Sequence, residues 1–209
     1  MPGTGKRSTQ GRGRARRAAL LSAAREMLGR HELDSISLGD VAEHAGIPKG
    51  SAYYFYKDIH EIYMELVELI GLELQDLLAK SLDGPYETWM DVVADCVELG
   101  RTVYATDPAA RQLLVGPKTP PEIKRADRRN DLELGNAFER QMGRFFELPD
   151  LPGRSEIFFR TIEIMDLMFC LSVMDHGEIT AAMAEEAKRA ATAYLSLYLP
   201  PYLPKKKPE

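Results

Sequence analysis

Hydrogen-bond donors are concentrated in one short stretch of the sequence, KGSAYYFYKD, which begins at Lys49. The Lys49 ammonium can donate to the O6 and N7 atoms of guanine, and Gly50 would let the backbone approach a base edge. The hydroxyls of Ser51 and Tyr54 can donate to phosphate oxygens, and Tyr53 can reach a base or a phosphate. These residue types make the stretch a candidate contact surface for double-stranded DNA.

Four aromatic residues run consecutively from Tyr53 to Tyr56. Successive side chains on a helix point in different directions, so such a row cannot face one side only. We predict that Phe55 and Tyr56 turn inward and fix the short helix against the next one, while Tyr53 and Tyr54 stay outside. The alternative places all four rings in the hydrophobic core, which would require a very short helix to be buried on every side.

The residues around this stretch have the pattern of a helix-turn-helix. Ser37 opens an S-x-x-D capping box for a first short helix, from Leu38 to about Ala45. Gly46 can adopt a positive φ and end that helix, and Pro48 presets the backbone at the start of the second helix, which ends near Tyr56. The close helix crossing needs small and apolar residues, and the sequence supplies Val41, Ala42, Ala45, Ile47 and Ala52.

Charge is distributed unevenly along the chain, whose net charge is −5. Residues 1–60 have a net charge of +4 and the remaining residues have a net charge of −9. This distribution indicates that only residues 1–60 contact a polyanion. Residues 1–13 are predicted to be a disordered basic arm that lies on phosphates or in a minor groove, with a solubilising tail as the alternative. Arg14, where helical periodicity begins, is included among the expected DNA contacts.

The rest of the chain has helical periodicity, and no segment has the pattern of a strand. A D-x-x-E box at Asp58 predicts the start of a long helix that ends near Lys80. Asp107 and Pro108 are the expected cap and first residue of a short helix. We predict an all-α fold of about nine helices, over residues 14–29, 38–45, 48–56, 58–80, 86–105, 108–114, 122–148, 155–176 and 180–199.

The segment ISLGDVAEHAGIPKGSAYYFYKDIHEIYMELV, Ile36–Val67, resembles the TetR family of transcriptional regulators. The resemblance covers about residues 14–67 and depends on the succession of AG, KGS, YY, an acidic cap and a long helix. It implies that a first group of residues contacts phosphates and a second group contacts bases. The first group is Ser37, Ser51 and Tyr54, and the second is Lys49, Gly50 and Tyr53.

Two positions depart from the family pattern. The histidine that usually follows the tyrosine pair is Phe55 here, which removes one backbone contact. The lysine expected near the start of the long helix is Ile59, and we assign its DNA contact to Lys57, two residues earlier.

The resemblance also implies a domain organisation. Residues 14–58 would form an N-terminal three-helix helix-turn-helix DNA-binding domain, and residues 59–200 a C-terminal helical domain for ligand binding and dimerisation. Residues 201–209 would be a tail. A homodimer would form through the last two helices, where small residues allow close approach. The same apolar stripes also suit the core of a single subunit.

The effector pocket implied by the resemblance has several candidate residues. Aromatic and methionine side chains after residue 86 can line a cavity, although each also suits ordinary core packing. Glu163 and Asp166 are more informative, because carboxylates on a largely apolar helix need a partner or water. They could bind a cationic ligand, pair with Arg160 or lie at the rim of a dimer. The full candidate set is Trp89, Tyr104, Phe138, Met142, Glu163 and Met168.

Several classes of function lack support in the sequence. There is no HExxH, GxSxG, Walker loop or convincing dinucleotide motif, so we expect neither an enzyme nor a metal or other cofactor. The two cysteines, Cys96 and Cys170, are far apart in sequence, which fits a reducing cytoplasm. The longest apolar stretch is less than half the length of a bilayer span, so we expect no membrane segment.

Three hypotheses for function follow from these patterns. The leading one is a cytoplasmic homodimeric repressor that binds a palindromic operator and is released by a small-molecule effector of unknown identity. The second is a DNA-binding activator or architectural protein without an effector. The third is a helical module that sequesters a ligand or docks a protein, in which the helix-turn-helix is only structural.

Overall fold

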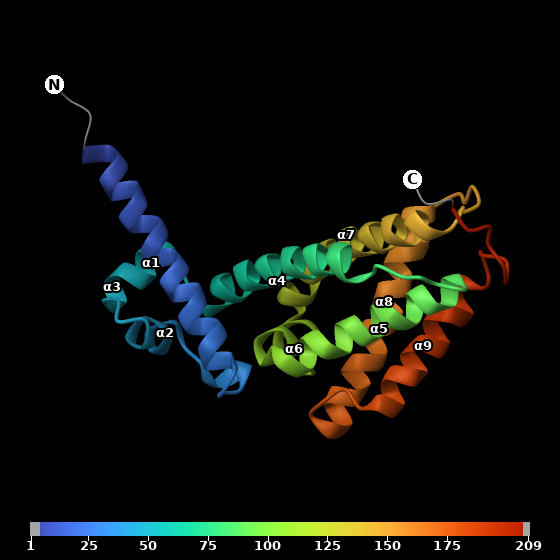
Figure 1. Ribbon diagram of the computed structural model, residues 1–209. Coiled ribbons are helices and arrows are strands. Elements are labelled where there is room, and N and C mark those ends of the chain that lie inside the picture. The colour runs from blue at the N-terminus through green and yellow to red at the C-terminus, as the bar shows by residue number, and fades with distance from the viewer. Residues whose placement is uncertain (1–4, 207–209) are drawn as a thin grey trace.

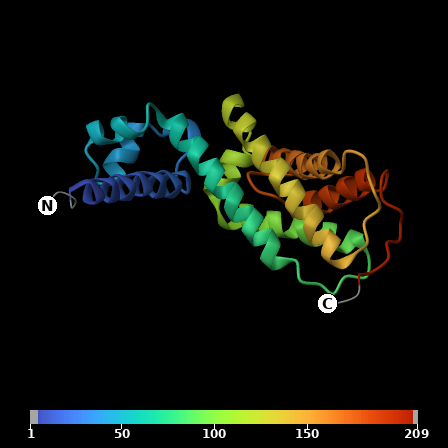
Figure 2. The same cartoon turned by 90° about the horizontal axis from the view of Figure 1, so that it is seen from above.

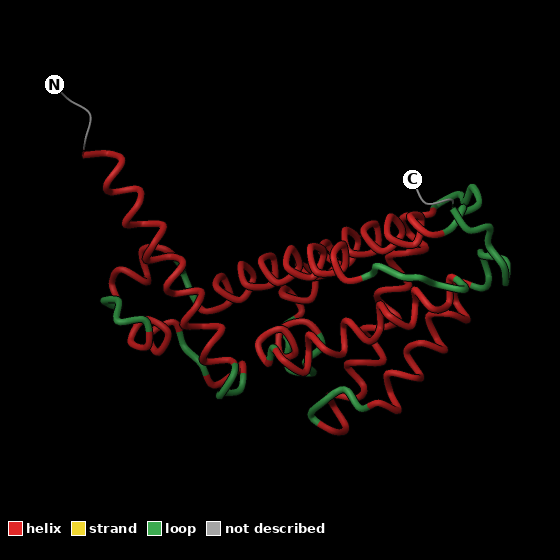
Figure 3. Tube along the Cα trace, viewed as in Figure 1, coloured by secondary structure: helices red, strands yellow, loops and turns green. Residues whose placement is uncertain are grey.

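The computed structural model describes residues 5–206 of the chain, with side chains from residue 11 onward. Over this range it contains nine α-helices, and Figure 3 shows no strand there. The prediction of an all-α fold with about nine helices is therefore confirmed. The helices are α1 (Gly5–Leu28), α2 (Leu38–His44), α3 (Lys49–Phe55), α4 (Ile59–Ser81), α5 (Trp89–Thr106), α6 (Pro108–Leu114), α7 (Pro121–Phe145), α8 (Arg154–His176) and α9 (Ala181–Leu195).

The molecule has two parts that α4 connects (Figure 1). Helices α1 to α3 form a small cluster at one end, and α5 to α9 form a larger bundle at the other. Seen from above, α4 runs beside α7 into the bundle, and α7 packs in turn on α8 and α8 on α9 (Figure 2). Helix α4 therefore belongs to both parts, because it packs on α1 as well as on α7.

Local signals start and end the two short helices where the sequence predicts. The Ser37 hydroxyl accepts a hydrogen bond from the Asp40 backbone N–H, and the Asp40 carboxylate accepts one from Ser37 N, which completes the capping box. Gly46 has φ of 64°, so the chain reverses without the steric cost that a Cβ would add. The Asp58 carboxylate accepts from Glu61 N and begins α4.

The basic arm differs from its predicted form. Helix α1 begins at Gly5, so residues 5–13 are helical rather than disordered, and residues 1–4 lie outside the described residues. Extending an existing helix costs far less than nucleating a new one, and arginine is a good helix former. The predicted arm therefore continues α1. The predicted tail, residues 201–209, is described only to residue 206. Within it, Lys205 forms a β-bridge with Phe146.

Three helix ends also differ from their predicted positions. Helix α5 begins at Trp89 instead of residue 86, because Thr88 and Asp91 form a capping box that fixes the start. Helices α7 and α9 end at Phe145 and Leu195, a few residues before the periodicity does. Apolar residues beyond a helix end can still be buried as turns, and Leu199 is an example.

Polar contacts tie α1 to the rest of the molecule. The Arg17 guanidinium donates to both carboxylate oxygens of Glu65 on α4, at 2.7–3.0 Å. Farther along α1, Arg25 Nη2 lies 2.6 Å from Glu73 on α4 and 2.6 Å from Asp107, the N-cap of α6. The α1–α4–α6 junction is therefore held by charged groups at two levels.

The Gln112 side chain makes a second connection between α6 and the N-terminal helices. Its Nε2 donates to the carbonyl oxygens of Leu28 and His31, at 2.7 and 2.9 Å, and its Oε1 accepts from Leu33 N at 2.8 Å. One side chain thus satisfies three backbone groups at the end of α1, where a helix leaves carbonyl groups without intrahelical partners. A displacement of α6 would be transmitted directly to α1.

Within residues 5–206, no helix combines the length and the apolar character that crossing a bilayer requires.

Candidate DNA interface and regulatory cavities

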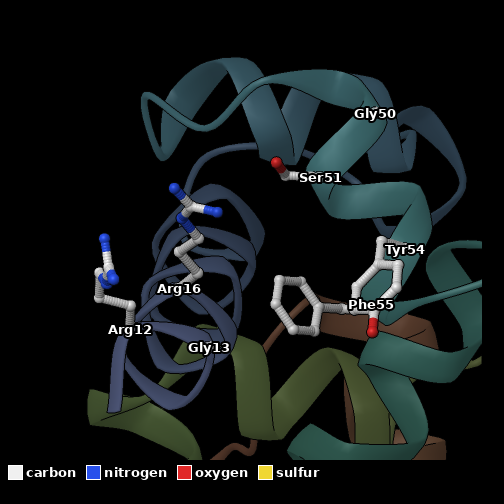
Figure 4. A pocket seen from close by; sticks show the side chains of 7 residues that line it. All are labelled: Arg12, Gly13, Arg16, Gly50, Ser51, Tyr54 and Phe55. Atoms are coloured by element: carbon white, nitrogen blue, oxygen red, sulfur yellow. The ribbon is translucent and has the colours of Figure 1, made fainter. Parts of the chain in front are cut away.

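A groove of about 750 Å³ lies between the N-terminal half of α1 and the exposed side of α3 (Figure 4). In Figure 4, Arg12 and Arg16 extend from α1 on one side, and Ser51 and Tyr54 lie opposite them on α3. Gly13 and Phe55 form the part between the two helices. Guanidinium and hydroxyl donors that face a common groove are suited to phosphate oxygens.

The aromatic row of α3 divides into two faces. Tyr53 and Tyr54 are 57% and 84% exposed, whereas Tyr56 is 2% exposed. The Tyr56 hydroxyl donates to Glu65 at 2.7 Å, which holds the end of α3 against α4. Phe55 is half-buried, with its ring edge-on to Tyr54 at 5.3 Å between centroids. This distribution contradicts the alternative in which all four rings belong to the core.

Lys49 and Gly50 lie at the exposed start of α3. The Lys49 ammonium folds back toward α2, where its Nζ is 3.9 Å from Glu43 Oε2. An ion pair this exposed contributes little to stability, so the lysine can leave it for a stronger acceptor at small cost.

The other predicted DNA contacts, Ser37, Lys57 and Arg14, occupy different places. Ser37 is exposed at the N-terminus of α2, where unpaired backbone N–H groups favour an anion. Its hydrogen bonds to Asp40 lower the pKa of that carboxyl. Lys57 is exposed in the turn before α4. Arg14 is exposed on α1 but does not line the groove.

Sequence reasoning missed Arg12 and Arg16 as individual candidates. The predicted arm ended at residue 13, so Arg12 belonged to a segment with no assigned geometry. Once α1 is continuous, the two arginines are four residues apart and share one face. The spacing itself was the available signal, and it becomes informative only when the helix is known to extend that far.

A second cavity, of about 390 Å³, opens between α7 and α8. We call its four carboxylates, Asp127 and Asp131 from α7 with Glu163 and Asp166 from α8, the acidic chamber. The outer part of the cavity is basic and is formed by Lys124, Arg125 and Arg128.

Two of these basic residues pair with chamber residues. Lys124 Nζ lies 3.8 Å from Asp127 Oδ2, and Arg128 Nε lies 3.3 Å from Glu163 Oε1. Sequence reasoning identified the two acids of α8 but missed the two of α7, because α7 is charge-rich along its whole length.

Burial determines the protonation of the acidic chamber. Loss of hydration, followed by the charge of Asp166, raises the pKa of Asp127 to about 8 and that of Asp131 to about 10. Burial also raises the pKa of Asp166 to about 7, against the opposing effect of Lys124. Near neutral pH the chamber therefore retains protons that exposed carboxyls would have lost.

A small apolar cavity of about 40 Å³ adjoins the chamber and shares Asp166 with it. Its walls come from α4, α5, α7 and α8 and include Leu74, Leu99 and Phe169. Tyr104 on α5 lines this cavity, and its hydroxyl lies 3.5 Å from Asp166 Oδ1.

The six predicted ligand residues do not lie together. Glu163 is in the wall of the acidic chamber and Tyr104 is in the wall of the apolar cavity. Trp89, Phe138 and Met142 are fully buried and line neither cavity; the Trp89 indole N–H donates to the Pro200 carbonyl at 2.9 Å. Met168 is partly buried against the core and also lines neither cavity.

Comparison with protein families finds two matches along the chain. Residues 20–66 match the family described as bacterial regulatory proteins, tetR family. Residues 87–199, more than half of the chain, match the family described as Tetracyclin repressor-like, C-terminal domain. No curated protein sequence matches the chain.

Several solved structures share the fold. A TetR-family transcriptional regulator from Streptomyces coelicolor has a TM-score of 0.69 at 19% identity, over 88% of this chain and 99% of that chain. SmeT, the repressor of the Stenotrophomonas maltophilia multidrug efflux pump SmeDEF, has a TM-score of 0.58 at 17% identity, over 92% and 96%. RolR in complex with resorcinol has a TM-score of 0.57 at 15% identity, over 95% and 98%. At these identities the likeness concerns the fold.

Proposed function

This chain belongs to the TetR family of bacterial transcriptional regulators, and from that premise we propose that it is a repressor that binds a palindromic operator as a homodimer. We further propose that a small molecule in the C-terminal domain releases it, and the complex of RolR with its ligand resorcinol, which has a similar fold, supports this. The observation that carries the proposal is the groove in which Arg12 and Arg16 face Ser51 and Tyr54 of α3. Bacterial DNA lies in the cytoplasm, so we propose that the protein acts there.

In the proposed complex, α3 enters the major groove and α1 follows the phosphates beside it. Lys49, Gly50 and Tyr53 would face base edges, because they lie on the exposed start of α3. Phosphate contacts would come from hydroxyls at α2 and α3, from the ammonium group in the turn before α4 and from guanidinium groups of α1. The residues that would contact phosphates are Ser37, Ser51, Tyr54, Lys57, Arg12, Arg14 and Arg16.

Lys49→Ala and Tyr53→Ala should each weaken binding to the specific operator by about 10- to 100-fold, because each removes a base contact. Both side chains are exposed, so the fold should be unchanged.

The double variant Arg12→Ala, Arg16→Ala should weaken binding to specific and non-specific DNA alike. It should also reduce the slope of log binding constant against log salt concentration by about two. The measurement is fluorescence anisotropy at several salt concentrations, with an operator selected from random DNA.

Tyr202→Ala is a suitable control, since Tyr202 is 84% exposed and lies beyond α9 in the sequence. It should bind like the unchanged protein. Selected sites without two-fold symmetry would contradict the palindromic operator, as would half-sites that are not spaced by about 34–36 Å or a multiple. Sequence preference retained by both alanine variants of α3 would contradict the assignment of base contacts.

We propose that the dimer forms through α8 and α9. Only some of the apolar residues of α8 are available for this interface. Most of the α8 stripe is buried inside the subunit, including Phe158, Ile162 and Met165. A different stripe stays exposed on α8, at Leu167, Leu171 and Met174. Exposed apolar residues at this spacing favour a partner helix.

Leu171→Glu combined with Met174→Glu should convert the dimer to a monomer, because each would place a carboxylate in an apolar interface. The monomer should bind the operator at least about tenfold more weakly, since it occupies one half-site at a time. Sedimentation velocity measures the first effect and anisotropy the second. Leu72→Glu, on the exposed side of α4, is the matched control and should stay dimeric. A dimeric double variant would show that α8 is not the interface.

Release is proposed to pass from the cavities through α5 and α6 to α1. Tyr104 borders both the apolar cavity and Asp166, and its carbonyl accepts a hydrogen bond from Arg111 on α6 at 2.8 Å. Helix α6 holds α1 through Asp107 and Gln112. A ligand that moves α5 would therefore tilt the N-terminal helices and change the distance between the two copies of α3. Effector and operator must then weaken each other equally.

A further inference from the structure

Within the proposed function, we propose that the effector is an organic cation with an apolar body, whose charged group is held between Asp131 and Asp166. Its apolar body would extend toward the apolar cavity that shares Asp166.

Asp131 is the residue from which this inference starts. It is only 7% exposed, and it lines the acidic chamber. Among residues 5–206, no group donates a hydrogen bond to it or forms an ion pair with it. A buried carboxyl without a partner is costly, and proteins normally provide one. Asp131 therefore has unused capacity to bind a donor or a cation that enters the cavity.

The neighbouring acids are only partly satisfied. Asp166 accepts a single long hydrogen bond, from the Tyr104 hydroxyl at 3.5 Å. The buried Oε1 atom of Glu163 lies near Arg128 but without the geometry of a hydrogen bond. The chamber thus contains more acceptors than its protein donors serve.

The basic residues of the cavity do not neutralise the inner pair. Lys124 lies closest to Asp127, Arg128 to Glu163, and the Arg125 Nε atom donates to the Pro121 carbonyl. Asp131 and Asp166 have no such ion pair within the described part of the chain. The outer part of the cavity is therefore basic, and its ion pairs go to Asp127 and Glu163 instead of the inner pair.

Size and geometry favour an organic cation over a metal ion. The cavity measures about 390 Å³, which falls within the usual range for sites that hold a small organic molecule. Within residues 5–206, no three His, Cys, Asp or Glu side chains converge on a position suited to a metal ion.

The apolar body of the proposed ligand is inferred from the apolar cavity, which shares Asp166 with the acidic chamber. Leu74, Leu99 and Phe169 line this smaller cavity. This cavity of about 40 Å³ is too small for a ring, so an apolar group would have to push its walls apart. Tyr104 is one of these walls, and its displacement would reach α6 through Arg111. The same ligand would thus satisfy the carboxylates and move the helix that leads to α1.

The charge of the site makes binding depend on pH. The groups that face the inner pair are Tyr104 and Cys96 from α5, Lys124 and Asp127 from α7, and Glu163 from α8. Because burial keeps protons on the chamber near neutral pH, a bound cation must displace them. Affinity for a cation of fixed charge should therefore rise from pH 6 to pH 8.5, with release of protons to the buffer.

Calorimetry on the full chain without DNA tests the site directly. The probes are benzyltrimethylammonium, which keeps its charge at every pH, and neopentylbenzene, its uncharged carbon isostere, below its solubility limit. The charged probe should bind at least about tenfold more tightly than the isostere. Asp131→Asn and Asp166→Asn should each weaken its binding at least about tenfold, and Glu133→Gln, an exposed acid on α7, should not.

Several outcomes would overturn the cation site. These are equal affinity for the two probes, unchanged binding in both asparagine variants, or no binding of the charged probe at millimolar concentration. Operator binding, measured separately by anisotropy, distinguishes this failure from failure of the proposed regulator. If the probe binds and operator affinity stays the same, the cation site stands and release by this cation fails. If the protein binds its operator but not the probe, the regulator stands and the cation site fails.

Discussion

Replacing Gly135 by alanine should lower the free energy of unfolding by about 2 kcal/mol, because α7 and α8 cross too closely there for a methyl group. A Cβ at this position would lie 2.7 Å from the backbone nitrogen of Phe159 and 2.9 Å from the carbonyl carbon of Phe158. Backbone atoms cannot rotate away as a side chain can, so the two helices would have to separate. We estimate an overpacking cost of about 3 kcal/mol, offset by about 1 kcal/mol from the better helix propensity of alanine.

Urea denaturation followed by circular dichroism measures this effect, and the melting temperature should fall by about 4–8 °C. Gly143→Ala on the same helix is the matched control. A Cβ there would lie 3.7 Å from Leu148 Cδ1, an ordinary contact. Its stability should be unchanged or rise by up to about 1 kcal/mol. Equal stability of the two variants would mean that the α7–α8 crossing relaxes without cost.

Replacing Asp131 by asparagine should stabilise the protein at pH 8 by about 2 kcal/mol, since it removes a carboxyl that is buried without a partner. Burial raises the folded-state pKa of Asp131 to about 10, above the ordinary value of 3.8 for this group. Between these values the unfolded chain gives up the proton and the folded protein keeps it. The stability of the unchanged protein therefore falls as pH rises through this window. Asparagine has nearly the same shape and does not titrate.

The measurement is a series of urea denaturation curves from pH 4 to pH 9. The unchanged protein and Asp131→Asn should coincide near pH 4 and diverge as pH increases, with the variant more stable. Glu133→Gln removes one exposed charge from the same helix and should stay within about 0.5 kcal/mol at every pH. If Asp131→Asn is less stable at pH 8, the carboxylate has a stabilising partner in solution. The same variant should lose cation binding while gaining stability, so that loss cannot be attributed to unfolding.

The acidic chamber is expected to destabilise the folded protein when no ligand is bound. Its carboxylates lie close together without enough cations to pair with, which lowers stability, and a bound cation restores that stability. SmeT and RolR have structures with triclosan and resorcinol. The proposed cation site predicts that this chain takes an organic cation instead.

Part of the candidate site could be predicted from sequence because it depends on contacts a few residues apart. The Ser37–Asp40 capping box, the positive φ of Gly46 and the Asp58 cap each involve neighbours within four positions. Their spacing fixes the two short helices, the turn between them and the exposed start of α3 at Lys49. The same local rules predicted that the fold is all-α.

The two cavities beside α8 could not be predicted to the same degree. Helical periodicity indicates that one face of a helix is buried, but it does not indicate which residue of another helix lies opposite. For this reason Trp89, Phe138 and Met142 were good candidates by type but belong to the packed core. Asp131 was indistinguishable from the other acids of α7 until α8 brought Asp166 beside it.

The sequence by itself therefore determined the helix-turn-helix, the helix inventory and the residues that α3 presents, since these follow from short-range hydrogen bonds and backbone preferences. Only the tertiary structure decided that Arg12 and Arg16 face α3 and that four carboxylates from α7 and α8 form one chamber. These arrangements depend on how far α1 extends and on the rotation and register of packed helices. Such quantities are set by the whole core, and no local spacing along the chain encodes them.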